Sequence, residues 1–135
     1  MAAMADPPEL APDLVVEVSV RSLATSLPFY LAFGFELIRR TGGFAVLSWG
    51  GRQLFLDEQP ALADLVGSER ANLRILVPDV DALWQQAQTL GAAIRTPIDD
   101  RSYGLRDFTV CDPDGFGLRF ASWLTPNILP QRPAN

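Results

Sequence analysis

The stretch 106-RDFTVCDPDGFGLRFASW-123 places two β-rich runs on either side of Asp112-Pro113-Asp114-Gly115. Proline presets φ for a turn, aspartate caps it, and glycine takes the position at which φ is positive. The stretch is therefore predicted to form a β-hairpin near the C-terminal end of the chain. In its second run Arg119 lies between Leu118 and Phe120, so its side chain faces either water or a polar cavity.

An internal repeat is the strongest sign of how the chain is organised. The interval between Val20 and Gly34 recurs between Val77 and Gly91. Each interval holds a capping residue and an apolar stripe with helical spacing, and three strand patterns follow each glycine. We therefore expect two modules over 13–58 and 70–123, a connector over 59–69, a disordered proline-rich lead over 1–12 and an extended tail over 124–135.

Local signals refine the two helices. Ser22 and Asp79 are the predicted N-caps, because short polar side chains accept hydrogen bonds from the first turn of a helix. Pro28 is a defect in the first helical pattern, since it lacks the N–H that the next turn needs.

The composition limits the class of protein. A chain of 135 residues is long enough for one compact domain or for two small modules that share a core. The net charge of −5 argues against nucleic acid as a partner, because phosphate contact needs a basic face. No apolar run could span a membrane, and the N-terminus lacks the pattern of a secretory signal. The single cysteine, Cys111, excludes an internal disulfide and fits a cytoplasmic protein.

Two groups of residues carry a resemblance to a known family. They are Val20-x-Ser22-Leu23-x-x-Ser26-x-x-Phe29-Tyr30 with Phe33-Gly34-Phe35, and Tyr103-Gly104-x-Arg106-x-Phe108 with Asp112-Pro113-Asp114-Gly115-x-x-Leu118. In these positions the chain resembles the glyoxalase, bleomycin-resistance and extradiol-dioxygenase superfamily, also called vicinal oxygen chelate proteins. The resemblance covers Leu14 to about Trp123 and implies an α+β fold, in which two βαβββ modules form a curved eight-stranded mixed sheet. It also implies a homodimer, because an open sheet edge favours association.

The resemblance bears on metal binding as well. In the metal-dependent members, four strand positions that face a cup supply His and Glu ligands, and here they fall on Val15, Leu56, Asn72 and Arg119. None is a usual ligand for Zn²⁺, Ni²⁺ or Fe²⁺, and an arginine opposes a cation. The chain contains no histidine, so the commonest general base is missing too. The resemblance therefore points to the metal-free bleomycin-resistance branch, which sequesters a small-molecule ligand without a cofactor and without catalytic residues.

Two alternatives stay open. The protein could be a metal-dependent lyase, isomerase or dioxygenase of the same superfamily that uses unconventional ligands. It could also be a scaffold or regulatory module without any small-molecule site.

Strand alternation predicts which side chains line the cup. The face that packs on the helices carries Val16, Val18, Val20, Leu73, Ile75, Val77, Leu118 and Phe120. The opposite face carries Val15, Glu17, Ser19, Leu54, Leu56, Asn72, Arg74 and Arg119. Apolar side chains with a few polar groups among them are typical of small-ligand pockets. The candidate ligand-binding residues are Glu17, Trp49, Leu56, Asn72, Arg74, Tyr103 and Arg119.

Each candidate also has an interpretation without a ligand. Arg74 and Arg119 bind an anionic or carbonyl-rich group with Glu17 orienting them, or Glu17 merely neutralises an arginine on a half-buried face. Trp49 stacks on a planar ligand, or it belongs to the core or its rim. Tyr103 borders the pocket mouth in the family, whereas Arg106 is expected to tie down the hairpin through Asp112 or Asp114.

Overall fold

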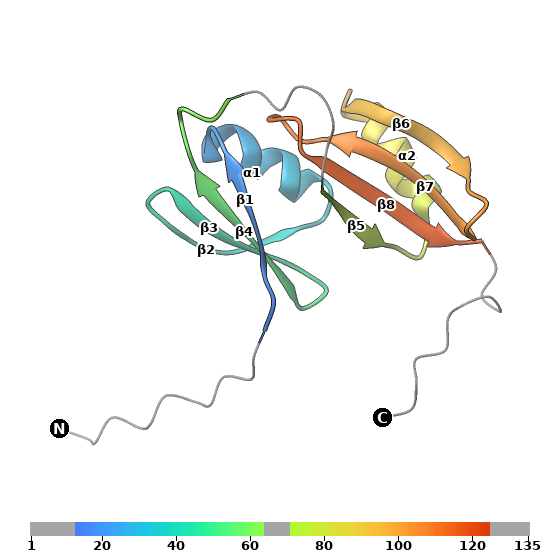
Figure 1. The fold of residues 1–135 in the computed structure, drawn as a ribbon, viewed down its shortest axis with the longest axis horizontal. Helices are drawn as coiled ribbons and strands as arrows, with labels where there is room; N and C mark the ends of the chain where they lie inside the picture. The colour runs from blue at the N-terminus through green and yellow to red at the C-terminus, as the bar shows by residue number, and fades with distance from the viewer. Residues whose placement is uncertain (1–12, 64–70, 125–135) are drawn as a thin grey trace, which may run out of the picture.

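The computed structural model describes residues 13–63 and 71–124 (Figure 1). The first module contains β1 (Val16–Val20), α1 (Leu23–Ala32), β2 (Glu36–Thr41), β3 (Phe44–Trp49) and β4 (Arg52–Glu58). The second contains β5 (Asn72–Leu76), α2 (Val80–Thr89), β6 (Ala93–Asp100), β7 (Leu105–Cys111) and β8 (Gly117–Trp123). The lead over 1–12, the connector from 64 onward and the tail from 125 onward lie outside the described residues. Neither helix is long and apolar enough to cross a membrane, and the rest of the described chain holds no other candidate.

Both modules have the same strand order. The first sheet runs β1-β4-β3-β2 and the second runs β5-β8-β7-β6. In each sheet the first strand pairs parallel with the last strand of its module, and the other pairs are antiparallel. This repetition confirms the predicted α+β fold of two βαβββ modules, with the eight strands divided between two hydrogen-bonded sheets of four.

The helices begin where the local signals predict. Ser22 Oγ accepts a hydrogen bond from the backbone N–H of Thr25 at 3.3 Å, and Asp79 Oδ1 accepts one from Ala82 at 3.2 Å. Both predicted N-caps are therefore confirmed. α1 runs through Pro28, because one side of the helix is buried and tertiary packing outweighs a local defect.

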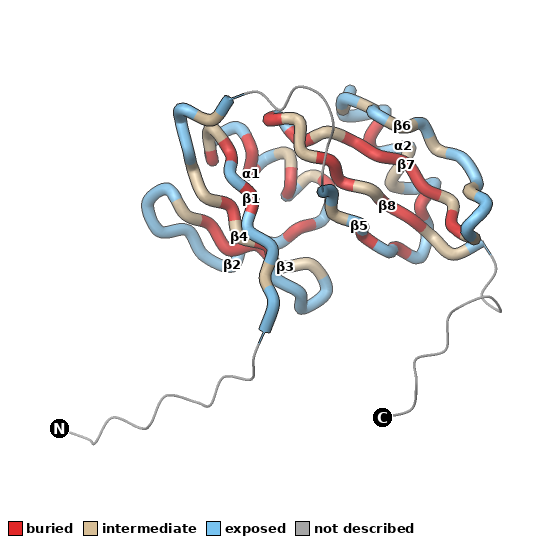
Figure 2. Tube along the Cα trace, viewed as in Figure 1, coloured by how far each residue is buried: buried red, intermediate tan, exposed pale blue. Residues whose placement is uncertain are grey.

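One hydrophobic core serves both modules. α1 lies between the two sheets in Figure 1, and its Phe33 ring stacks on Phe120 of β8 with 5.3 Å between centroids. The Tyr30 hydroxyl donates a buried hydrogen bond of 2.8 Å to Asp112 Oδ2, in the turn between β7 and β8. These contacts attach the helix of the first module to the hairpin of the second. Figure 2 shows buried residues along the inner strands, whereas β2 is exposed over its whole length.

Each sheet has one face toward the helices and one face away from them, which we call the open face. Residues paired directly across neighbouring strands share a face. By this register the first open face contains Glu17, Ser19, Phe44, Phe55 and Asp57. The second open face contains Asn72, Arg74, Asp107, Thr109 and Arg119.

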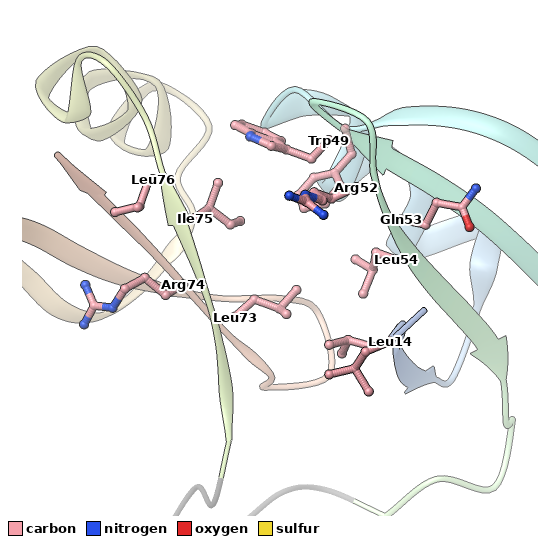
Figure 3. Close-up of a pocket in the computed structure, with 11 residues that line it drawn as sticks. Leu14, Trp49, Arg52, Gln53, Leu54, Leu73, Arg74, Ile75 and Leu76 are labelled. Carbon is pink, nitrogen blue, oxygen red and sulfur yellow. The ribbon is translucent and has the colours of Figure 1, made fainter. Parts of the chain in front are cut away.

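Within one chain the two open faces point away from each other. Leu54 of β4 faces Leu73 and Ile75 of β5 across a cleft, as Figure 3 shows. Arg74 and Gln53, which alternate with these residues, point outward on opposite sides. The described residues of a single chain therefore do not bring the two open faces together into the cup that the sequence led us to expect. The reason is that α1 packs on both modules and draws their helix-facing sides inward.

Candidate functional site

Asp107 is the centre of a polar cluster on the second open face. It is fully buried in β7, between Arg106 and Phe108. Its carboxylate accepts hydrogen bonds from Arg74 Nη1 at 3.0 Å, Arg101 Nε at 2.7 Å, the Tyr103 hydroxyl at 2.7 Å and Arg119 Nη2 at 3.4 Å. We call these five residues the Asp107 cluster. Three arginines and a tyrosine thus converge on one carboxylate.

Strand register and a tight loop bring the cluster together. Arg74 on β5 is directly opposite Arg119 on β8, and Arg119 is opposite Thr109 on β7. Asp107 is two residues before Thr109 and so shares its face. Arg101 and Tyr103 come from the loop between β6 and β7, which a hydrogen bond of 3.1 Å from the Gly104 N–H to the Arg101 carbonyl closes.

The cluster carries a net positive charge. Burial opposes ionisation of Asp107, but hydrogen bonds from Arg101, Tyr103 and Arg74, with the charge of Arg119, outweigh it and lower the pKa of the carboxyl to about 2. Asp107 is therefore ionised at neutral pH. Because three guanidinium groups surround this one carboxylate, the cluster has a net charge of +2 within a chain whose total is −5.

Two of the arginines keep unused hydrogen-bond donors. Arg119 Nε is buried and lies 3.2 Å from Asp107 Oδ2, yet it makes no hydrogen bond within the described part of the chain. Arg74 uses Nη1 on Asp107, and its guanidinium lies over the Tyr103 ring, 5.7 Å from the centroid. A guanidinium has five N–H donors. The arrangement can therefore accept an additional oxygen-bearing ligand.

The structure unites three of the predicted ligand-binding residues in one cluster and places the other four outside it. Arg74, Tyr103 and Arg119 belong to the Asp107 cluster. Glu17 is exposed and lines a pocket of about 330 Å³ between β1 and β5, together with Asn72. The expectation that Glu17 orients or neutralises the arginines is wrong, because Asp107 takes that role.

Trp49 lies on the helix side of the first sheet. It lines the cleft of about 470 Å³ between the modules, with its ring 5.0 Å from that of Phe35 (Figure 3). Its ring also approaches Gly34 so closely that a Cβ there would lie 3.0 Å from Cζ3. Trp49 thus belongs to the rim of the core, one of the two interpretations that the sequence allowed. Val16 was expected to pack against the helix, but it is 43% exposed and lines the same cleft.

Leu56 was assigned to the wrong face. It pairs with Val18 and Ala45, and all three side chains are buried in the core. The open-face positions of β4 are instead Phe55 and Asp57. Leu54 shares the error, since β4 is apolar on both faces at this point and alternation alone does not fix its register.

The residues at the family's metal positions do not fit a metal ion. With the register corrected, those positions offer aliphatic and aromatic side chains, the amide of Asn72 and the guanidinium of Arg119, and the carboxylates near them, which are those of Glu17, Asp57 and Asp107, form no group of three. Transition metals need several imidazole, thiolate or carboxylate ligands. The described ranges contain no group of three His, Cys, Asp or Glu side chains that could hold an ion.

Asp107 and Arg101 are the functional residues that sequence reasoning missed. A hairpin centred on the Asp112–Gly115 turn pairs Thr109 with Arg119, and this register could have placed Asp107 on the arginine face. Arg101 carries no comparable signal, because a loop contact cannot be derived from alternation. Arg106 does not tie down the turn as expected. It pairs with Asp81 of α2 at 3.1 Å and Asp100 of β6 at 3.0 Å.

Comparison with known proteins agrees with this architecture. A crystal structure of a glyoxalase/bleomycin resistance protein/dioxygenase from Alicyclobacillus acidocaldarius has a TM-score of 0.73 at 21% identity, covering 94% of this chain and 100% of the other. A bleomycin-binding protein complexed with bleomycin has a TM-score of 0.67 at 20% identity, covering 83% and 98%. A lactoylglutathione lyase from Agrobacterium tumefaciens has a TM-score of 0.66 at 18% identity, covering 87% and 96%.

These similarities at low identity show a shared fold. None of the curated proteins matches the sequence. The family model of the glyoxalase/bleomycin resistance protein/dioxygenase superfamily matches residues 14–120, which include every element of both modules except the last residues of β8. The chain therefore belongs to the glyoxalase/bleomycin resistance protein/dioxygenase superfamily.

Proposed function

We propose that this protein binds a small molecule without a metal ion, in a cup that two copies of the chain complete together. The observation that carries the proposal is the Asp107 cluster, a buried polar centre with unused donors on an open sheet face. Such a centre is costly to a fold unless its charges are paired. A binding role explains why this polar centre is present, because ligand pockets place a few polar groups on an otherwise apolar surface.

The direction of the open faces supports a homodimer. The two faces of one chain point apart, so a cup needs the first open face of one copy opposite the second open face of another. A two-fold axis that makes one such cup also makes a second, identical cup. The faces are complementary, since Glu17 and Asp57 on the first are acidic and the Asp107 cluster is basic. The Phe44 and Phe55 rings, 5.1 Å apart, supply an aromatic floor to the first face.

Binding without chemistry is favoured by the acid–base properties of the site. A carboxyl with a pKa of about 2 is too weak a base to abstract protons near neutral pH. The chain has no histidine to replace it. Sequestration in the cytoplasm of a small organic compound, such as a glycopeptide antibiotic, is the role we infer by analogy with the bleomycin-binding relative.

Two solution measurements test the proposal. Light scattering coupled to size-exclusion chromatography is expected to give the mass of a dimer. Titration with bleomycin-type compounds is expected to change tryptophan fluorescence, because Trp123 ends β8 on the strand that carries Arg119. A monomer that responds to none of the compounds would contradict the proposal. Stoichiometric divalent metal in protein purified without chelators would favour the metal-dependent alternative.

A further inference from the structure

We propose that the ligand of the second open face carries an oxyanion group, a carboxylate or a phosphate, and that this group binds between Arg74 and Arg119. The inference rests on the proposed binding function of this face and names the chemistry that the face selects. It follows from the different roles of the three arginines in the Asp107 cluster.

Arg101 has a structural role. Its Nε donates to Asp107 Oδ1 at 2.7 Å, and its Nη2 donates to the carbonyl oxygens of Pro97 at 2.7 Å and Asp107 at 3.2 Å. These bonds hold the loop between β6 and β7 against the sheet. The Arg101 guanidinium also supplies the one positive charge that is needed to balance the Asp107 carboxylate.

The Asp107 cluster holds no second carboxylate, so the positive charges of Arg74 and Arg119 are not balanced within it. They are directly opposite each other on β5 and β8, and like charges on neighbouring strands repel. Their side chains are 33% and 25% exposed, so a solute can reach both. An oxyanion would accept hydrogen bonds from the N–H groups of Arg74 and Arg119 that Asp107 and Tyr103 do not use, and it would offset the repulsion.

The distribution of charge across the sheet places the anion at the β5 side. The strand order is β5, β8, β7, β6. Arg74 and Arg119 pair on the first two strands, whereas Asp107 and Asp99 pair on the last two, with Asp107 two residues from the Thr109 that pairs with Arg119. Both carboxylates are thus on the β6 side, and Asp99 accepts a hydrogen bond from the backbone N–H of Asp100 at 2.8 Å. A cation that approaches from the β5 side would be repelled by the two arginines before it reached either carboxylate. An anion that approaches from the same side would be attracted by the arginines and would stay farther from both carboxylates.

Binding of simple oxyanions to the full chain tests the inference. Inorganic phosphate and succinate serve as separate probes, at ionic strength held constant with chloride, and calorimetry and the melting temperature are the readouts. We expect saturable binding and a melting temperature that rises with probe concentration. Arg74→Gln and Arg119→Gln should each weaken binding roughly ten- to a hundredfold, as the loss of a charge-assisted hydrogen bond implies. The matched control is Arg39→Gln on the first sheet, where Arg39 bonds to Thr41 Oγ1.

The outcomes separate this inference from the proposed function. The Asp107 cluster lies within one chain, so oxyanion binding does not require a dimer. If neither probe binds the wild-type protein while a neutral or cationic compound does, the oxyanion inference is wrong and the binding function stands. Binding that Arg39→Gln weakens as much as Arg74→Gln would show charge attraction alone and would also overturn it. If Arg119→Gln does not fold, Arg119→Lys keeps the charge without the planar fork and should bind more weakly than wild type.

Discussion

Replacing Asp107 by Asn removes the negative charge around which the second open face is built. The three arginines would then face one another without a counter-charge, and the amide would present N–H groups where the carboxylate accepts hydrogen bonds. Removal of one partner of a buried ion pair costs about 3–5 kcal/mol. The arginine side chains are 33%, 21% and 25% exposed, and solvent screens part of their repulsion. We therefore expect a loss near the lower limit, about 3 kcal/mol, which for a chain of this length lowers the melting temperature by about 10 °C.

Thermal unfolding followed by circular dichroism measures this loss, and calorimetry checks that unfolding is two-state. The matched control is Asp99→Asn, which makes the same chemical change at an exposed aspartate on the neighbouring strand and should cost under ~0.5 kcal/mol. Equal losses in the two variants would refute the reasoning, because the cluster would then not depend on its carboxylate. An Asp107→Asn variant with the same melting temperature as the wild type would also refute the reasoning.

Three further predictions concern the core and the pH dependence of stability. Tyr30→Phe removes the buried donor to Asp112 and should lower the free energy of unfolding in urea by about 2 kcal/mol; a loss below ~0.5 kcal/mol would mean that this bond does not join the modules. Because the pKa of Asp107 is lowered to about 2 from an ordinary 3.8, its contribution of about 2 kcal/mol is present above pH 4 and is lost as the pH falls toward 2. The stability difference between wild type and Asp107→Asn should therefore shrink over that range, and a constant difference would contradict the assignment. Gly34→Ala should cost about 1–3 kcal/mol, since φ is +109° and the new Cβ would meet Trp49 at 3.0 Å; Gly50→Ala, with φ of +53° and open space around it, should cost less.

Local sequence signals determined the parts of this fold that local forces control. Ser22 and Asp79 cap their helices because the accepting oxygen and the donating N–H are three residues apart. The repeat then predicted two modules of the same topology. Pro28 shows the limit of such signals, since burial of one side of α1 outweighs the missing hydrogen bond.

Features that depend on contacts between distant strands were harder to predict. In β4 the run Leu54, Phe55, Leu56 is apolar on both faces, so alternation gave Leu56 to the wrong side. The partner of the arginines is Asp107 rather than Glu17, which only the register of the β7–β8 hairpin reveals. The opposite directions of the open faces follow from contacts of α1 with the second module, and no periodicity within either module contains that information.

A crystal structure of the full chain grown with phosphate tests the central claim most directly. We expect a two-fold dimer in which Arg74 and Arg119 of one copy lie opposite the Phe44–Phe55 face of the other, with a phosphate within hydrogen-bond distance of both guanidinium groups. A structure in which the Asp107 cluster faces bulk solvent, or in which the phosphate binds elsewhere and leaves both arginines without it, would contradict the account.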